Sequence, residues 1–199
     1  KNVTGELACI GRWNGQILGM DGNLLIEQAS LFEQPFKKAH AKFIMRNTSP
    51  DVLLVGLKAP IYSGDVVGQV RVDLNSSLRY EMNLTASQIN LAEFGRTNLG
   101  PKSKISGIAS GRLYLHGYGT GMDTMEGNGA VDIPNGHFYN LPVVLDLLKS
   151  LGQHGPDRTV FEEFHTAFGI QGAKVNVQKI DLLGSAVSLS GKGEFDLQS

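Results

Sequence analysis

The sequence predicts a mostly β protein, with one strongly curved antiparallel sheet shaped as a trough or as a half-open sandwich or barrel. Side chains alternate between apolar and polar along many segments, as they do in strands that bury one face. Glycine accounts for 25 of the 199 residues, about 13% where roughly 7% is typical. Because glycine inside a strand marks a bend, a bulge or a close backbone approach, a sheet with many glycines is expected to curve strongly.

The alternation is clearest between residues 186 and 197, where one parity holds Val187, Leu189, Phe195 and Leu197. The same pattern recurs at 66–74, 79–85, 112–116, 164–170 and 174–177. About a dozen strands are expected in total, and so many strands in one open sheet normally curl or split.

A change of parity occurs after the segment 174–177. Beyond it the apolar residues are Ile180 and Leu182, which no longer share the odd parity of Val177. An extra residue in one strand returns the later side chains to the same face of the sheet. The sequence therefore predicts a β-bulge at Gln178–Lys179.

Helical spacing appears in a single clear stripe. Leu141, Val144, Leu145 and Leu148 recur at helical intervals, with Leu151 continuing the stripe. The spacing predicts a helix over 141–151, which either packs against the sheet or gates the mouth of the trough. Shorter helices are expected at 157–163 and at 87–94.

Residues 1–199 are expected to form a single β domain, since no linker divides the chain. A weak internal boundary is predicted near 98–106, after a first group of about six strands. The chain begins with Lys1 rather than methionine, so we interpret it as a segment of a longer protein. No apolar run is long enough for a membrane-spanning helix, and any membrane anchor is expected outside the segment.

Composition excludes several classes of protein. Acidic and basic residues balance to a net charge of −1, and the longest basic cluster is Lys37–Lys38, which argues against nucleic-acid binding. The single cysteine, Cys9, excludes an internal disulfide framework and a cysteine-based zinc site. It does not fix the cellular compartment.

Catalytic and cofactor motifs are weak. The G-x-G-x-G string at Gly117, Gly119 and Gly121 lacks the following helix that a dinucleotide site requires, so it predicts a curved hairpin region instead. Glu162 and His165 form one E-x-x-H, whereas a di-iron bundle needs two copies. The five histidines are dispersed. We therefore expect no cofactor, no metal and no enzymatic activity, although a spatial Ser-His-Asp triad leaves no pattern in the sequence.

An ordered succession of short motifs resembles one family. Gly127-Asn128-Gly129, an apolar strand at 131–133, Asn135-Gly136, Leu141-Pro142 opening a helix, and a closing strand at 191–197 are similar to the C-terminal region of AsmA-like proteins. Upstream segments at 62–64, 68–73, 84–87 and 105–113 fit the same pattern. The resemblance covers 14–197, without the tract 157–163.

The resemblance implies a bacterial envelope protein of the AsmA/TamB type. Such proteins are anchored in the inner membrane and extend curved β-sheets with an apolar inner face into the periplasm. It implies that this segment binds phospholipid, takes part in bridge-like lipid transport between membranes and supports outer-membrane biogenesis.

If the trough exists, the apolar parity of the strands must line it. The predicted lipid-binding residues are Val70, Val72, Tyr80, Met82, Leu84, Leu113, Leu115, Val175, Val177, Val187 and Leu189. The residues predicted to face water are Arg71, Asp73, Arg79, Glu81, Lys174 and Lys192. Two alternatives remain: a structural or protein-interaction β domain whose apolar face is a sealed core, and a hydrolase that uses one of the histidines.

Overall fold

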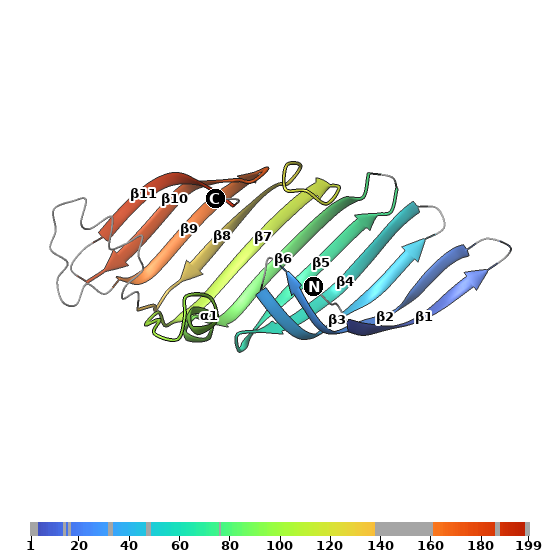
Figure 1. The fold of residues 1–199 in the computed structure, drawn as a ribbon, viewed down its shortest axis with the longest axis horizontal. Helices are drawn as coiled ribbons and strands as arrows, with labels where there is room; N and C mark the ends of the chain where they lie inside the picture. The colour runs from blue at the N-terminus through green and yellow to red at the C-terminus, as the bar shows by residue number, and fades with distance from the viewer. Residues whose placement is uncertain are drawn as a thin grey trace.

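Eleven strands and one short helix make up the part of the chain that the computed structural model describes (Figure 1). The described residues are 4–13, 15, 17–31, 34–46, 49–75, 77–137, 161–185 and 188–197. The elements are β1 (Thr4–Trp13), β2 (Ile17–Leu31), β3 (Gln34–Arg46), β4 (Ser49–Ile61), β5 (Gly64–Asp73), β6 (Arg79–Asn90), α1 (Leu91–Asn98), β7 (Ile108–Tyr118), β8 (Glu126–Ile133), β9 (Phe161–Gln171), β10 (Lys174–Gly184) and β11 (Ser188–Asp196).

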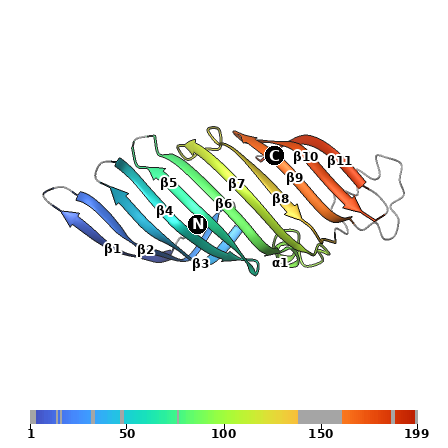
Figure 2. The ribbon, with the colours of Figure 1, turned by 180° about the vertical axis from the view of Figure 1, so that it is seen from behind.

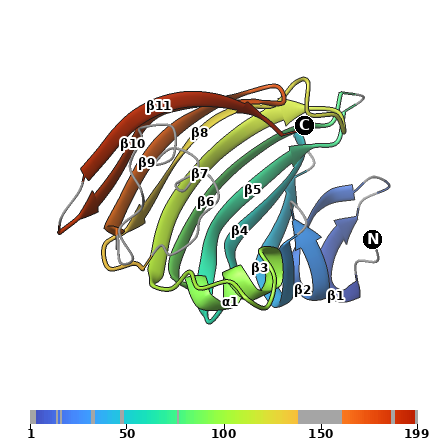
Figure 3. The same ribbon diagram turned by 60° about the vertical axis from the view of Figure 1, so that its left-hand side comes forward.

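The strands form one antiparallel sheet in which spatial order equals sequence order, from β1 to β11. The sheet does not close, so β1 and β11 lie at opposite edges (Figures 1 and 2). Seen from the side, the strands arch and give the sheet one concave and one convex face (Figure 3). The predicted fold class, a strongly curved antiparallel β-sheet with little helix, is confirmed.

The predicted bulge at Gln178–Lys179 is also confirmed. Val177 of β10 pairs with Phe168 of β9, and the register then shifts between Val177 and Lys179. Beyond the shift, Ile180 and Leu182 face the same side as Val177.

The predicted helix at 87–94 is wrong in its position. Residues up to Asn90 stay in β6 because they still pair with β7, with Asn90 opposite Ile108. The helix begins only at Leu91, since the Asn90 side chain accepts hydrogen bonds from the N–H groups of Ala92 and Glu93, at 2.9 and 3.2 Å. Such a cap satisfies donors that the first helical turn leaves unpaired.

The predicted helix at 157–163 is wrong where the structure describes it. Residues 161–163 open β9, and Glu163 pairs with Leu183 of β10, so ladder pairing outweighs the local helical pattern. Residues 157–160, and the whole predicted helix 141–151 with Leu141, Val144, Leu145 and Leu148, lie outside the described residues. The sheet runs without interruption past 98–106, because β6 and β7 pair directly.

Cross-strand pairs of a large side chain and a glycine recur on the concave face. In each pair the large side chain occupies the space that a β-carbon on the glycine would need. These pairs are Leu84 with Gly68, Tyr80 with Gly117, Leu115 with Gly127, and Phe168 with Gly129. Side chains on the inside of a curved sheet have less room than those outside, so this small-and-large pairing permits the curvature.

One closed hydrophobic cluster lies at the α1 end of the sheet. Its buried members are Leu91, Ile105, Ala109, Ile133, Phe161 and Leu182. The cluster joins the start of α1 and the loop after it to the ends of β7 to β10, and it anchors the first turn of the helix.

Replacing Gly129 by valine should destabilise the fold. The added side chain would overlap the Phe168 ring and the backbone of Arg112, and overpacking of this kind typically costs about 1–3 kcal/mol. Gly193→Val is the matched control, since no atom lies within 4 Å of a β-carbon at that position. Chemical denaturation of both variants checks this expectation; equal stability would contradict the packing role of the Phe168–Gly129 pair.

Candidate binding groove

The antiparallel register gathers the predicted lining residues on one face. Directly opposed residues share a face of the sheet, and Val72 pairs with Tyr80 while Leu84 pairs with Leu113. The ladder adds the pairs Val70–Met82, Met82–Leu115 and Leu182–Leu189, and Val175 and Val177 of β10 face the same side. Val187 lies outside the described residues.

This face is apolar but only partly buried. Leu84, Leu115 and Val175 are buried, whereas the remaining described members of the predicted set are half-buried: Val70, Val72, Tyr80, Met82, Leu113, Val177 and Leu189. A side chain in a sealed core would have lost nearly all of its exposure, so much of this face meets solvent.

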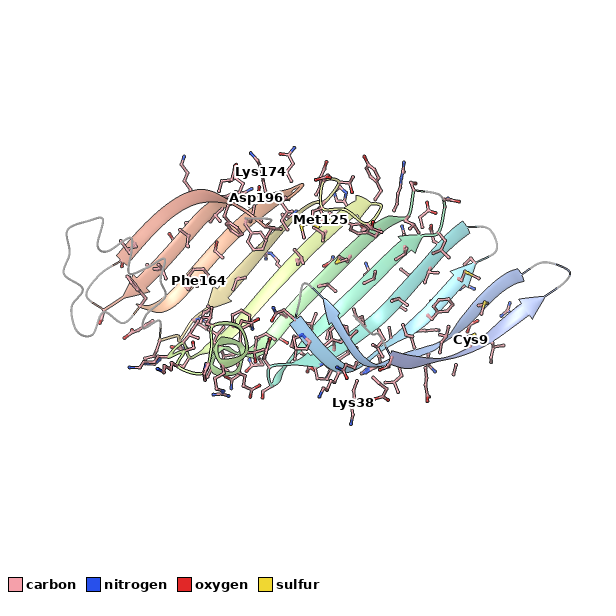
Figure 4. The ribbon with its side chains drawn as sticks, in the orientation of Figure 1. Cys9, Lys38, Met125, Phe164, Lys174 and Asp196 are labelled. Carbon is pink, nitrogen blue, oxygen red and sulfur yellow. The ribbon has the colours of Figure 1, made fainter. Side chains whose placement is uncertain are left out.

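The residues predicted to face water lie on the other face. Arg71 lies opposite Glu81 in the ladder. Lys174 lies opposite Asp196 of β11 and forms an ion pair with Glu194, with 3.3 Å between the Lys174 Nζ and the Glu194 Oε1. Charged side chains project from the strand ends that lie opposite α1, near Lys174 (Figure 4). All are exposed except Asp73, which is half-buried.

The first four strands extend the same apolar face, which the sequence pattern did not reveal. Leu54 pairs with Val70, and Phe43 pairs with Leu54. Two irregularities hide the alternation here. A bulge between Leu54 and Leu57 contains Gly56, whose φ of 60° is in the left-handed region that favours glycine.

The second irregularity lies in β3. Lys38 has a φ of 56°. Before Lys38 an even-numbered residue faces the concave side, whereas after it the odd-numbered residues do. Ala39 and Ala41, at odd positions, are buried, whereas Phe36, at an even position, also reaches the concave face. A strict alternation would place Lys37 there instead.

A cavity of about 340 Å³ occupies the concave face. Its lining comes from every strand between β3 and β9, and side chains from strands so far apart can share one cavity only because the sheet curves inward. The lining residues are Gln34, Phe36, Leu57, Ala59, Ile61, Val66, Leu84, Ala86, Gly111, Arg112, Leu113, Ala130, Val131 and Phe168. We call this cavity the concave groove.

Two larger clefts of the described residues differ in their chemistry. One of about 530 Å³ is lined by charged and hydroxyl-bearing side chains that include Arg71, Glu81 and Tyr114. Clefts of this kind are already solvated and offer no dry surface. The concave groove is therefore the candidate site for an apolar ligand.

A ring of hydrogen bonds holds α1 beside one end of the groove. The Tyr62 hydroxyl donates to the Gln34 side chain at 2.7 Å, Gln34 donates to Asn98 at 3.0 Å, and Asn98 donates to the Tyr62 hydroxyl at 3.1 Å. The Tyr62 ring also packs edge-on against Phe94. Since Gln34 lines the groove, this ring joins the wall formed by β3 to the last turn of α1.

Ionic interactions on the convex face perturb two pKa values. The Asp132 carboxylate, 2.9 Å from His165 Nδ1, raises the pKa of His165, and Glu163 adds to the effect. Hydrogen bonds from Lys179 and Ser190 lower the pKa of Asp181. On the concave face, burial raises the pKa of Tyr80 above its ordinary value.

These polar groups do not form a nucleophile–base pair within the described residues. The Ser190 hydroxyl donates to Asp181, and the His165 ring bonds to Asp132 and Glu163. His116 lies 4.0 Å from Glu126, and His154 is outside the described ranges. Among the residues that the structure describes, no cluster of three or more His, Cys, Asp or Glu side chains could hold a metal ion.

No helix among the described residues has both the length and the apolar character needed to cross a membrane. Comparison of the chain with protein-family models, with curated proteins and with solved structures found no match.

The His165 cluster should make stability depend on pH. Because the folded pKa of His165 is raised above its usual value of about 6.5, its stabilising effect is complete below about pH 6.5 and is lost as the pH rises through the folded pKa. Asp132→Asn should weaken this dependence and lower the His165 midpoint, because only Glu163 then still raises the pKa of His165. Thermal melts across this range and NMR titration of the His165 ring measure both; an unchanged midpoint in Asp132→Asn would show that the pair is not formed in solution.

Proposed function

We propose that this chain is a non-enzymatic lipid-binding and lipid-transfer module that holds phospholipid acyl chains in the concave groove. The observation that carries the proposal is an apolar face that extends over the whole sheet and remains half-exposed. Apolar surface of this extent is rarely left in water by a soluble protein unless it binds something.

The chemistry of the groove suits an acyl chain. Each buried methylene contributes roughly 0.8 kcal/mol without any directional partner, and the groove offers aliphatic side chains and two phenylalanines. Polar lining residues are limited to Gln34 and Arg112. A headgroup would stay outside, in water.

The dimensions of the groove also fit. Its lining crosses seven strands from β3 to β9, and six strand spacings of 4.7–4.9 Å give an arc of about 29 Å along the curved sheet. One leaflet of a bilayer is about half of the roughly 30 Å hydrocarbon core, so an acyl chain needs about 15 Å. An extended acyl chain is therefore short enough to lie across the strands.

The wider biological context rests on the resemblance to AsmA-like proteins. From this resemblance we infer a module in the bacterial periplasm, tied to the inner membrane by an anchor outside this segment, that acts in outer-membrane biogenesis through bridge-like lipid transport. Its partner is phospholipid, with no role for nucleic acid. The concave apolar groove supports this assignment because a trough is what such transport requires.

The main alternative is a structural or protein-interaction domain with a sealed apolar face. Against it stands the partial exposure of Val70, Val72 and Met82, since a sealing layer would bury them. A hydrolase is less well supported, because the histidine contacts described above lack a nucleophile.

Neighbouring valines provide the test. Val66 lines the concave groove, whereas Val67 lies on the convex face and is 39% exposed. A photo-crosslinking amino acid at position 66 should label co-purified or added phospholipid, and the same probe at position 67 should not. Equal labelling from both positions, or no lipid by extraction and mass spectrometry, would contradict the proposal.

A charge in the groove should block binding. Val66→Glu should reduce binding of a fluorescent phospholipid by tenfold or more, because an ionised carboxylate cannot be buried beside acyl chains. Val67→Glu should bind as the wild type does. Circular dichroism of both variants shows whether the fold is kept, and equal binding by two folded variants would exclude the groove as the lipid site.

A further inference from the structure

The convex face carries a polar cleft that is separate from the concave groove. The cleft has a volume of about 560 Å³ and crosses five strands, from β7 to β11. Four strand spacings of 4.7–4.9 Å give it an arc of about 19 Å. At its centre lies Gly169 of β9, paired with Asn128 of β8 on one side and with Asn176 of β10 on the other. We call this hollow the amide cleft.

Glycine at position 169 keeps the centre of the amide cleft open. Its φ is not in the left-handed region. Beyond its chain neighbours, the nearest atom to a β-carbon there would be the Gln178 Nε2, at an ordinary contact distance of 3.6 Å. By contrast, a β-carbon at Gly127 or Gly129 would collide with neighbouring strands. The fold therefore has room for a side chain at position 169, and its absence leaves space for a ligand.

The β-bulge in β10 adds an amide to the cleft. Val177 and Ile180 both face the concave side, so the two residues between them, Gln178 and Lys179, occupy the convex side where a regular strand has one. Of these two, Gln178 lines the cleft. Bulges redirect side chains and are over-represented beside active sites. This one brings a second amide of β10 next to Gly169.

Side-chain amides are the most frequent groups in the lining, which contains Asn128, Gln171, Asn176 and Gln178. All four are exposed, and among the described residues none of their side chains is hydrogen-bonded to another protein group. Each amide offers two N–H donors and a carbonyl acceptor. The cleft therefore presents donors and acceptors side by side without a fixed charge on any of them.

The charged groups of the lining face one another. The Lys174 Nζ lies 3.3 Å from the Glu194 Oε1, and the His116 Nε2 lies 4.0 Å from the Glu126 Oε2. An anionic ligand such as phosphate is best bound by cations that have no carboxylate partner, and a cationic ligand needs the reverse. These pairs favour a ligand that is polar but carries no net charge.

Tyr114 forms an aromatic wall at the β7 end of the cleft. Its hydroxyl donates a hydrogen bond to the Glu81 carboxylate, and its ring centroid lies 5.5 Å from that of His116. A ring held by such contacts loses little conformational freedom when a ligand packs against it. The face of an aromatic ring carries partial negative charge, which attracts the C–H groups of a ligand.

We propose that the amide cleft binds a neutral oligosaccharide, with one sugar ring packed against Tyr114 and a later ring over Gly169. Sugar hydroxyls donate and accept hydrogen bonds, as the amides of the lining do. The C–H groups of a sugar ring supply the apolar surface that packs against an aromatic side chain. The cleft crosses several strands, which suits a linear chain of sugars better than a single one.

A peptide fits the amide cleft less well. Extended peptides that bind to sheets pair with a free strand edge through their backbone, whereas β8, β9 and β10 are each paired on both sides. The cleft also lies on the face of the sheet opposite the concave groove. The proposal is therefore independent of whether the groove binds phospholipid.

Titration with neutral hexasaccharides tests the proposal on the 199-residue chain. Cellohexaose, chitohexaose and maltohexaose differ in linkage and in substitution. At least one of them should shift the NMR signals of the Asn128, Asn176 and Gln178 side-chain amides and leave those of Val66, which lines the concave groove, unchanged. The absence of any shift with all of the hexasaccharides would overturn the proposal.

Charged probes distinguish this site from a site for ions. Inorganic phosphate and pentalysine should leave the same amide signals unchanged, and the affinity for the hexasaccharide should not depend on salt, because no ion pair forms on binding. If either charged probe bound at these amides more tightly than the hexasaccharides, the cleft would be a site for a charged ligand and the proposal would be wrong.

Filling the centre of the cleft should block the sugar. Gly169→Leu should weaken hexasaccharide binding roughly tenfold or more, because the new side chain occupies the space over β9. Gly193→Leu is the matched control, since position 193 is open as well and does not line the cleft. Circular dichroism shows whether both variants fold. Equal binding by the two folded variants would overturn the proposed site.

Substitutions of Tyr114 test the aromatic contact. Tyr114→Phe keeps the ring and should keep most of the affinity, whereas Tyr114→Ala should weaken binding roughly tenfold or more. Val66→Glu, which is designed to block the concave groove, should leave hexasaccharide binding unchanged. A folded Tyr114→Ala variant that binds as tightly as the wild type would overturn the proposed arrangement of the sugar rings.

Discussion

Antiparallel pairing between sequence neighbours is the constraint on which this structure depends. Opposed residues share a face of the sheet, so the register of each strand pair decides which residues of the next strand face the same side. The eleven strands thereby keep their apolar side chains on one side. A slip of one residue anywhere would turn the following strands over. The bulges in β4 and β10 insert extra residues but preserve the facing of the strand, since Leu57 and Ile180 still lie on the concave face.

Curvature and apolarity come from the same residues. A leucine or phenylalanine opposite a glycine covers the glycine backbone and leaves no room for a second side chain, as Phe168 does over Gly129. The face can then bend inward without empty space between strands. The result is a concave surface of aliphatic and aromatic groups, and the convex face is left to ion pairs such as Lys174 with Glu194.

Alternation made the fold class and the apolar face predictable from the sequence, although of the predicted lipid-binding residues only Leu84 and Leu113 line the concave groove itself. Residues such as Val70, Val72, Met82 and Leu113 were placed correctly on one face because their strands are regular. Phe36 and Leu57 were missed, since the backbone at Lys38 and Gly56 has positive φ and interrupts the alternation. The position of α1 was missed because β6 continues to Asn90, with Ile89 and Asn90 still paired with β7, and the Asn90 cap starts the helix only at Leu91.

A single-layer sheet leaves folding and binding coupled. A two-layer protein covers its apolar face with another element, whereas here the buried side chains of the described residues that pack together as a cluster lie at the α1 end, around Leu91, Ile105 and Phe161. The middle of the sheet keeps half-exposed valines and leucines. Any ligand that covers them removes apolar surface from water and stabilises the folded chain by an amount that rises with the logarithm of the ligand concentration relative to its Kd. The feature that makes the sheet incomplete as a globular core is thus the one that suits it to hold a lipid.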